Sequence, residues 1–230
     1  METGLDMKLS IIVPVLNEAR VLPALLERLL PLLRHGCEVI IADGGSEDGS
    51  AAIAACAGFT VVRAPRGRAL QMNAGAAHAG GAALLFLHAD TQLPDGACAV
   101  VAEALSGETC CWGRFDVCIA GRPWMLRLVA RMMNLRSRLT GIATGDQAMF
   151  VTRAAFEAAG GFPEQPLMED IELSKRLRAI SRPACVRRCV ITSGRRWETR
   201  GVWRTIFLMW RLRWAYWRGA DAAGLAERYR

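Results

Sequence analysis

Residues 9–18 read LSIIVPVLNE and residues 38–49 read EVIIADGGSEDG, so each is a short apolar run that ends in polar residues. Such runs, rich in β-branched residues, are typical of buried strands. Between them, residues 20–33 repeat apolar residues at helical spacing. This alternation of strand and helix predicts a parallel sheet with helices on its faces.

The alternation continues to residue 87, and the pattern changes after about residue 110. Apolar runs predict strands at residues 9–15, 38–42, 60–63, 83–87, 112–119 and 148–152. Helical spacing predicts helices at residues 20–33, 47–56, 70–79, 124–139 and 170–179. We therefore expect a single α/β domain with a mostly parallel central sheet flanked by helices.

Composition limits the class of protein. The chain has 230 residues and is 52% hydrophobic, so it is long enough to bury one core and too apolar to be disordered. Residues 195–218 hold seven arginines and one acid, and thus six of the seven net positive charges. Charge that is so localised favours a local anionic partner, and we expect no nucleic acid to bind.

The N-terminal sequence METGLDMK contains two acids and no apolar stretch, unlike a secretory leader. The eight cysteines lie among apolar segments, which favours reduced core residues over disulfides. We therefore expect a cytoplasmic protein.

Polar residues follow each of the first four predicted strands. Ligands bind beyond the carboxyl ends of strands in open parallel sheets, so these residues should meet in one crevice. Arginine suits phosphate recognition, and an acid there can hold a divalent cation that bridges a diphosphate. The candidates are Pro14, Asn17 and Glu18 after the first strand, Asp43 and Gly44 after the second, Arg66 and Arg68 after the third, and His88 and Asp90 after the fourth.

Several of these candidates also have a purely structural interpretation. Asn17 and Glu18 could cap the helix that follows them, and Ser46 or Asp48 could cap the next one. The two arginines could belong to a solvated surface loop, and Asp90 could only form a turn.

Two later motifs carry acids. Gly145 and Asp146 precede a predicted strand, and Glu169 and Asp170 open a predicted helix. A carboxylate of the second pair can serve as a general base. The structural alternative is that the helix dipole favours acids in a first helical turn.

Residues 203–217 form an aromatic stripe at helical spacing. A core helix, a contact between copies of the chain and a helix lying on anionic lipid would each produce this pattern. The stripe consists of Trp203, Ile206, Phe207, Trp210, Trp214 and Trp217, flanked by Arg204, Arg211, Arg213 and Arg218.

Together, P-x-x-N-E at 14–18, D-G-G-S-x-D-G at 43–49, H-A-D at 88–90 and E-D at 169–170 resemble the family 2 glycosyltransferases. The resemblance covers about residues 9–180 and implies the Rossmann-like GT-A fold. The strings RGRALQMNAGA, TGIATGDQAMFV and SGRRWE followed by GVWRT resemble one branch, the radical-SAM/selenodomain-associated transferase 2 group.

We accordingly divide the chain into a GT-A domain at 1–195 and a helical Arg/Trp-rich C-terminal extension at 196–230. Within the domain, about 9–110 is the nucleotide-binding half and about 111–195 the acceptor half. The resemblance implies a metal-dependent, inverting transfer of a hexose from a UDP or GDP sugar to a hydroxyl or phosphate acceptor.

The resemblance also implies residue roles. Asp170 would be the catalytic base, with Glu169 as the second choice, and Gly145 and Asp146 would face the acceptor. Asp90 would ligate Mg²⁺ or Mn²⁺, although His88 stands where the family usually has a first acid. The donor residues would be Pro14, Asn17, Glu18, Asp43, Gly44, Arg66, Arg68, His88, Asp90, Arg195, Arg196 and Trp197.

Three alternatives remain at this point: a polyprenyl-phosphate acceptor at the membrane surface, nucleotidyltransfer, and a non-catalytic module that binds nucleotide sugars. Contact of residues 203–217 with the inner membrane surface, or with a second copy, also remains open.

Overall fold

The computed structural model describes residues 7–107 and 109–229. The sequence METGLDMK, which differs from a secretory leader, therefore lies mostly outside the described residues. The first half of the chain consists of β1 (Leu9–Val15), α1 (Leu22–Arg34), β2 (Glu38–Asp43), α2 (Ser50–Cys56), β3 (Thr60–Arg63), α3 (Arg68–His78) and β4 (Ala83–Phe86). All of these elements are predicted from the sequence to within three residues. The helix α2 begins late because Gly49, just before it, has a left-handed φ of 87°.

The second half begins with β5 (Thr91–Gln92), α4 (Ala97–Leu105), β6 (Trp112–Ala120), α5 (Met125–Thr140), β7 (Phe150–Thr152) and α6 (Arg153–Ala158). It ends with α7 (Glu169–Ile180), β8 (Ala184–Ser193), α8 (Arg195–Arg200), α9 (Val202–Trp217) and α10 (Ala222–Tyr229). The predictions of β6, α5, β7 and α7 are confirmed. The division predicted between residues 195 and 196 falls inside α8.

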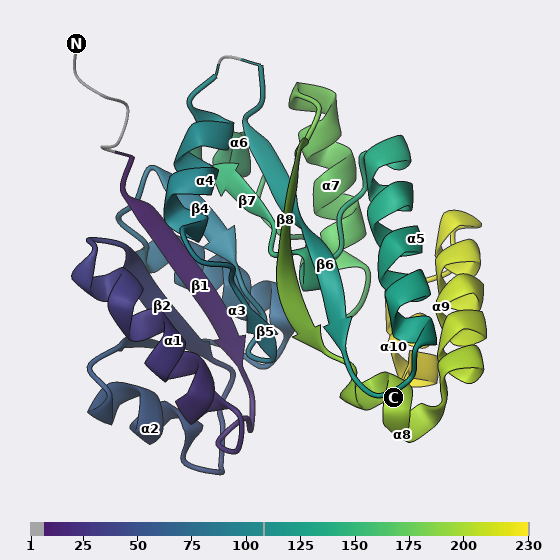
Figure 1. Cartoon of the computed structure of the whole chain (residues 1–230), viewed down its shortest axis with the longest axis horizontal. Coiled ribbons are helices and arrows are strands. Elements are labelled where there is room, and N and C mark those ends of the chain that lie inside the picture. The colour runs from purple at the N-terminus through teal and green to yellow at the C-terminus, as the bar shows by residue number, and fades with distance from the viewer. Residues whose placement is uncertain (1–6, 108, 230) are drawn as a thin grey trace.

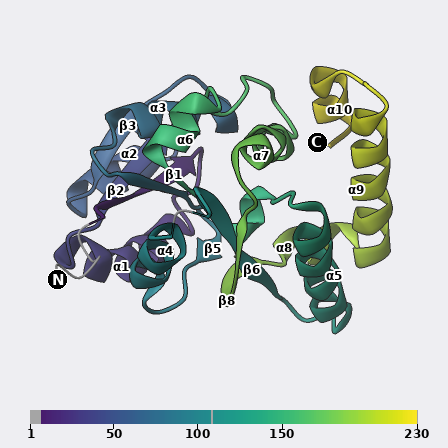
Figure 2. The same ribbon diagram turned by 90° about the horizontal axis from the view of Figure 1, so that it is seen from above.

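Within the described residues, the sheet has eight strands in the order β3-β2-β1-β4-β7-β6-β8-β5. β3, β2, β1 and β4 are parallel to one another. β7 runs antiparallel to both β4 and β6, whereas β8 is parallel to β6. The expected α/β fold with a mostly parallel sheet is confirmed. Figures 1 and 2 show α1 and α4 on one face of the sheet and α3, α6 and α7 on the other.

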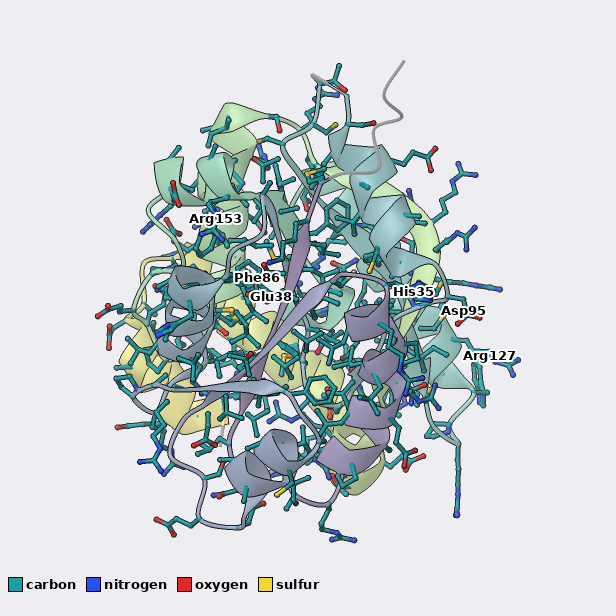
Figure 3. All side chains as sticks on the ribbon, turned by 90° about the vertical axis from the view of Figure 1, so that its left-hand side faces the viewer. His35, Glu38, Phe86, Asp95, Arg127 and Arg153 are labelled. Atoms are coloured by element: carbon teal, nitrogen blue, oxygen red, sulfur yellow. The ribbon has the colours of Figure 1, made fainter. Side chains whose placement is uncertain are left out.

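Buried apolar side chains fill the space on both faces of the sheet. Phe86 from β4, labelled in Figure 3, lies in the interior with its ring centroid 4.8 Å from that of Phe162. A smaller cluster joins Leu212 of α9 and Leu225 of α10 to Met168, which precedes α7. The C-terminal helices therefore pack against the start of α7.

The aromatic stripe of α9 is exposed, so its interpretation as core is wrong for this chain. The interpretation of the cysteines as core residues holds in part: Cys37 is buried and Cys98 and Cys111 pack against the core, whereas Cys56 and Cys118 are exposed. Among the helices that the structure describes, none is long and apolar enough to span a bilayer.

Candidate functional site

A cavity of about 540 Å³ lies where β1 and β4 end and α7 begins. It gathers most of the residues that the sequence singles out, from segments up to 180 positions apart. The predicted site residues that line it are Pro14, Glu18, Arg68, His88, Asp90, Gly145, Asp146, Glu169, Asp170, Arg195, Arg196 and Trp197.

The other predicted donor residues, Asn17, Asp43, Gly44 and Arg66, do not line this cavity. The carboxylate of Asp43 is buried and accepts hydrogen bonds from the backbone N–H groups of Gly45 and Ser46, both at 3.1 Å. The N–H of Ser46 also donates to Oδ1 at 3.3 Å, so the loop that follows Asp43 contacts both of its oxygens. The predicted role of Asp43 beside the nucleoside stays a prediction.

Asn17 connects the loops that follow β1 and β2. Its Oδ1 accepts a hydrogen bond from the backbone N–H of Glu47 at 2.9 Å, and its own N–H donates to Ser46 Oγ at 3.0 Å. Neither Asn17 nor Glu18 caps α1, because that helix starts without a side-chain cap. The capping interpretation is thus wrong for these two residues.

Glu18 and Asp90 bring carboxylates to the cavity from the ends of β1 and β4. Burial raises the pKa of the Glu18 carboxyl above its ordinary value, and the nearby Asp90 adds to this against the opposing effect of Arg195. Asp90 is exposed, and its Oδ1 accepts a hydrogen bond from the Thr91 hydroxyl at 3.3 Å.

Asp90 could take part in binding a divalent cation. Among the described residues, no three His, Cys, Asp or Glu side chains gather as a metal site. However, Mg²⁺ commonly binds one or two carboxylates together with substrate phosphates and water. A hard, exposed carboxylate oxygen beside arginines fits that mode, with Asp90 as the protein ligand.

His88 pairs with Asp146 across the cavity wall, with 3.4 Å between Nδ1 and Oδ1. Removal from solvent alone would raise the pKa of the Asp146 carboxyl. The hydrogen bond with His88, together with Arg68 and Arg196, outweighs this effect and lowers the pKa. His88 therefore acts here on the neighbouring carboxyl of Asp146.

Gly145 allows the close approach of this segment to His88. A Cβ at this position would lie 2.4 Å from the imidazole ring, which is closer than real Cβ contacts. The backbone N–H of Gly145 also donates to Asp170 Oδ2 at 2.9 Å. The glycine thus connects the His88–Asp146 pair with the acids of α7.

Gly145→Ala is expected to lower the activity of this site at least about tenfold, because a Cβ 2.4 Å from the imidazole must displace the ring, which misplaces both His88 and Asp146. The melting temperature should change little. Gly224→Ala in α10 is the matched control, because a Cβ there meets nothing within 4 Å. Wild-type activity in Gly145→Ala would contradict this prediction.

The acids of α7 lie in its first turn, after Met168 in a left-handed conformation with φ of 65°. Glu169 is buried, with its Oε1 3.7 Å from Arg68 Nη1. Asp170 accepts the Gly145 hydrogen bond and one from the N–H of Ile171 at 2.7 Å. Burial raises the pKa of both carboxyls; Asp170 contributes to the rise at Glu169, and Asp146 to the rise at Asp170.

Glu169→Gln is expected to raise the melting temperature at pH 8 by about 2–4 °C. Because folding raises the pKa of Glu169, the folded state binds its proton more tightly, and stability falls as the pH rises through that raised pKa. The difference between variant and wild type should therefore shrink below the ordinary pKa of glutamate. Thermal melts from pH 4 to 8 measure this, with exposed Glu27→Gln as control; a lower melting temperature at pH 8 would refute it.

Arginines form the basic part of the cavity. Arg68 is the first residue of α3, and Arg195 and Arg196 begin α8. Burial lowers the pKa of the Arg196 guanidinium, and the neighbouring Arg200 and Arg68 lower it further. Positive charges held this close favour a ligand with two or more negative charges.

Some residues of the C-terminal helices line the cavity although no sequence pattern predicts them as site residues. Met209 and Arg213 of α9 line the cavity, and so does Tyr229 of α10. The Tyr229 ring lies 3.9 Å from the Arg196 guanidinium carbon. Only Arg213 has a signal in the sequence, as one of the arginines that flank the aromatic stripe.

Residues 10–157 match the model of a protein family described as glycosyl transferase family 2. The chain belongs to this family. No curated protein matches the chain in a sequence search. The matched region thus covers β1 to α6 and supplies the cavity residues at the ends of β1 and β4, whereas the end of β8, with Thr192 and Ser193, lies outside it.

Solved glycosyltransferase structures share the fold at low sequence identity. The mannosyltransferase PcManGT from Pyrobaculum calidifontis, in complex with GDP-Man and Mn²⁺, has a TM-score of 0.65 and 20% identity over 91% of this chain and 61% of its own. S. aureus TarS 1-349 in complex with UDP-GlcNAc has a TM-score of 0.64 and 17% identity over 81% of this chain and 58% of its own. The chain thus spans about three fifths of the length of these two structures.

Glucosyl-3-phosphoglycerate synthase from Mycobacterium tuberculosis, in complex with UDP, has a TM-score of 0.57 and 18% identity over 80% of this chain and 70% of its own. These likenesses show the GT-A fold for the family 2 domain.

Proposed function

We propose that this chain transfers a sugar from a nucleoside-diphosphate donor of the UDP or GDP type to a hydroxyl or phosphate acceptor, with inversion at the sugar carbon. One observation carries the proposal: arginines of α3, α8 and α9 and carboxylates of α7 and the strand exits line a single cavity. Family membership supports the same activity.

In this proposal, Arg68, Arg195 and Arg196 bind the donor diphosphate, because guanidinium groups match phosphate oxygens in geometry and charge. Asp90 would hold Mg²⁺ or Mn²⁺. When bound, the cation supplies charge stabilisation for the leaving group. The arginines supply the same kind of stabilisation from the protein itself.

Asp170 is the proposed general base. Its raised pKa makes its carboxylate a stronger proton acceptor than that of an ordinary aspartate. As Asp170 takes the proton of an acceptor hydroxyl, the acceptor oxygen bonds to the sugar carbon and the bond to the diphosphate breaks. Gly145 and Asp146 lie on the acceptor side in this scheme, and Glu169 keeps Arg68 in place.

A donor screen tests the proposal most directly. Nucleoside diphosphates and their hexose conjugates should raise the melting temperature, and more so with Mn²⁺, because a ligand of the native state stabilises it by mass action. Failure of every nucleoside diphosphate to shift the melting temperature, with and without Mn²⁺, would refute donor binding.

Product analysis separates this proposal from its rivals. A sugar transferase releases a nucleoside diphosphate, whereas a nucleotidyltransferase releases pyrophosphate. A non-catalytic module releases neither product and should tolerate Asp170→Asn without loss of function. A cytoplasmic location and membership of the radical-SAM/selenodomain-associated branch stay predictions.

A further inference from the structure

Two neighbouring helices expose apolar side chains that the fold does not use. Ten of the twelve large hydrophobic residues that are exposed in the described part of the chain lie on α9, on α5, or at Trp124 just before α5. Single exposed apolar residues are ordinary, but a concentration of this kind marks an interaction surface. The ten are Trp124, Leu128, Met132, Leu135, Leu139, Trp203, Phe207, Trp210, Trp214 and Trp217.

The spacing places each set on one face of its helix, because neighbours in each set are three or four residues apart. On α9 the aromatic rings contact one another along that face, with centroids 6.4 Å apart for Trp203 and Phe207 and 6.3 Å for Phe207 and Trp210. The buried side of α9 carries Thr205 and Leu212. Figures 1 and 2 both show α5 and α9 side by side at one end of the molecule.

Arginines flank both apolar faces. Arg204 and Arg211 of α9 and Arg218, which directly follows that helix, are spaced seven residues apart, so they form a row beside the stripe, and all three are exposed. On α5, Arg127 and Arg131 are exposed in the same way, and Figure 3 shows Arg127 projecting from the edge of the molecule. Neither helix contains an aspartate or glutamate.

We propose that α5 and α9 together form a docking surface for an anionic phospholipid bilayer. Interfacial helices combine an apolar face rich in tryptophan with arginine or lysine on the flanks, and they lie in the plane of the membrane. Tryptophan prefers the headgroup region, and each arginine gains energy from the negative surface potential. This inference goes beyond the proposed sugar transfer and does not depend on it.

A second copy of the chain fits this surface less well. It would offer the same two helices, which have arginines and no acids, so none of the flanking arginines would meet an opposite charge on them. Anionic lipid supplies both an apolar layer and negative headgroups. Charge complementarity thus favours the bilayer.

Docking on a bilayer would also bring the cavity close to the membrane. α9 contributes Met209 and Arg213 to the cavity from a face other than the stripe. One helix therefore contacts both the bilayer and the cavity in this proposal.

Vesicle sedimentation of the full chain tests the docking surface. The wild type should bind vesicles of phosphatidylcholine with phosphatidylglycerol, bind pure phosphatidylcholine far more weakly, and be released by salt. Trp210→Ser with Trp214→Ser should weaken binding at least about tenfold, because the apolar contact is lost. Both residues are exposed, so the melting temperature should stay unchanged.

Arg204→Gln with Arg211→Gln should weaken binding about 25-fold, since each arginine near an anionic surface contributes about a factor of five. The matched control is Arg28→Gln with Arg34→Gln on α1, which removes the same charge at the opposite end of the molecule (Figure 1). The control should bind like the wild type.

Three results would overturn the proposal: no binding of the wild type to anionic vesicles, wild-type binding by the tryptophan variant, or an equal loss in the arginine control. Sedimentation velocity adds a fourth, because a dimer that the tryptophan variant dissociates would assign the surface to a second copy. The donor screen, carried out without lipid, reports on the proposed function separately.

Discussion

Asp170→Asn is expected to lower turnover by about 10³-fold, within the range that a general base contributes. Donor binding should change little, because the loss concerns an interaction made in the transition state. Asparagine has nearly the same volume, but its one oxygen replaces only one of the two acceptors, Oδ2 for the N–H of Gly145 and Oδ1 for the N–H of Ile171. Calorimetry with the nucleoside diphosphate and steady-state kinetics measure the two effects separately.

The pH dependence of wild-type turnover provides a second readout. A base must be unprotonated, and burial raises the pKa of Asp170, so turnover should rise with pH through that raised pKa. Glu169→Gln is the matched variant and should retain much more activity. If Glu169→Gln loses as much turnover as Asp170→Asn or more, the assignment of the base to Asp170 is wrong.

Asp90→Asn is expected to lower turnover about 10²-fold, the effect of losing several kcal/mol of metal-ion stabilisation. Unlike Asp170→Asn, it should also abolish the gain in nucleoside diphosphate affinity that Mn²⁺ gives the wild type. Titrations of the nucleotide with and without Mn²⁺ measure this gain directly.

Asp95→Asn is the control for Asp90, because Asp95 is exposed in the same region of the chain and does not line the cavity. It should retain both the turnover and the metal effect. An undiminished Mn²⁺ effect in Asp90→Asn would show that the cation binds elsewhere.

The sequence predicts the parallel part of the sheet well because β1, β2 and β4 are buried on both faces and therefore appear as uninterrupted apolar runs. The same reasoning fails for β8, whose sequence ACVRRCVITS has two arginines in the middle. One face of that strand is exposed there, and a bulge in the pairing of β6 with β8 lies nearby, between Phe115 and Asp116.

The site is predicted in part for a similar reason. Residues that follow strands of a parallel sheet meet at one edge, which is why Glu18, Arg68 and Asp90 share a cavity. Side-chain direction does not follow from this rule, and Asp43 turns into its own loop. Tyr229 is missed because its place depends on how the C-terminal helices fold back, which no local pattern encodes.

The cluster of Met168, Leu212 and Leu225 has a consequence for the order in which the site is built during synthesis. Chains emerge from the ribosome N-terminus first, so β1 to β4 can assemble while α9 and α10 are still being made. Until those helices dock, the left-handed turn before Glu169 and Asp170 has no apolar support on that side. A nascent chain would then possess β1 to β4 before the start of α7 is packed against α9 and α10.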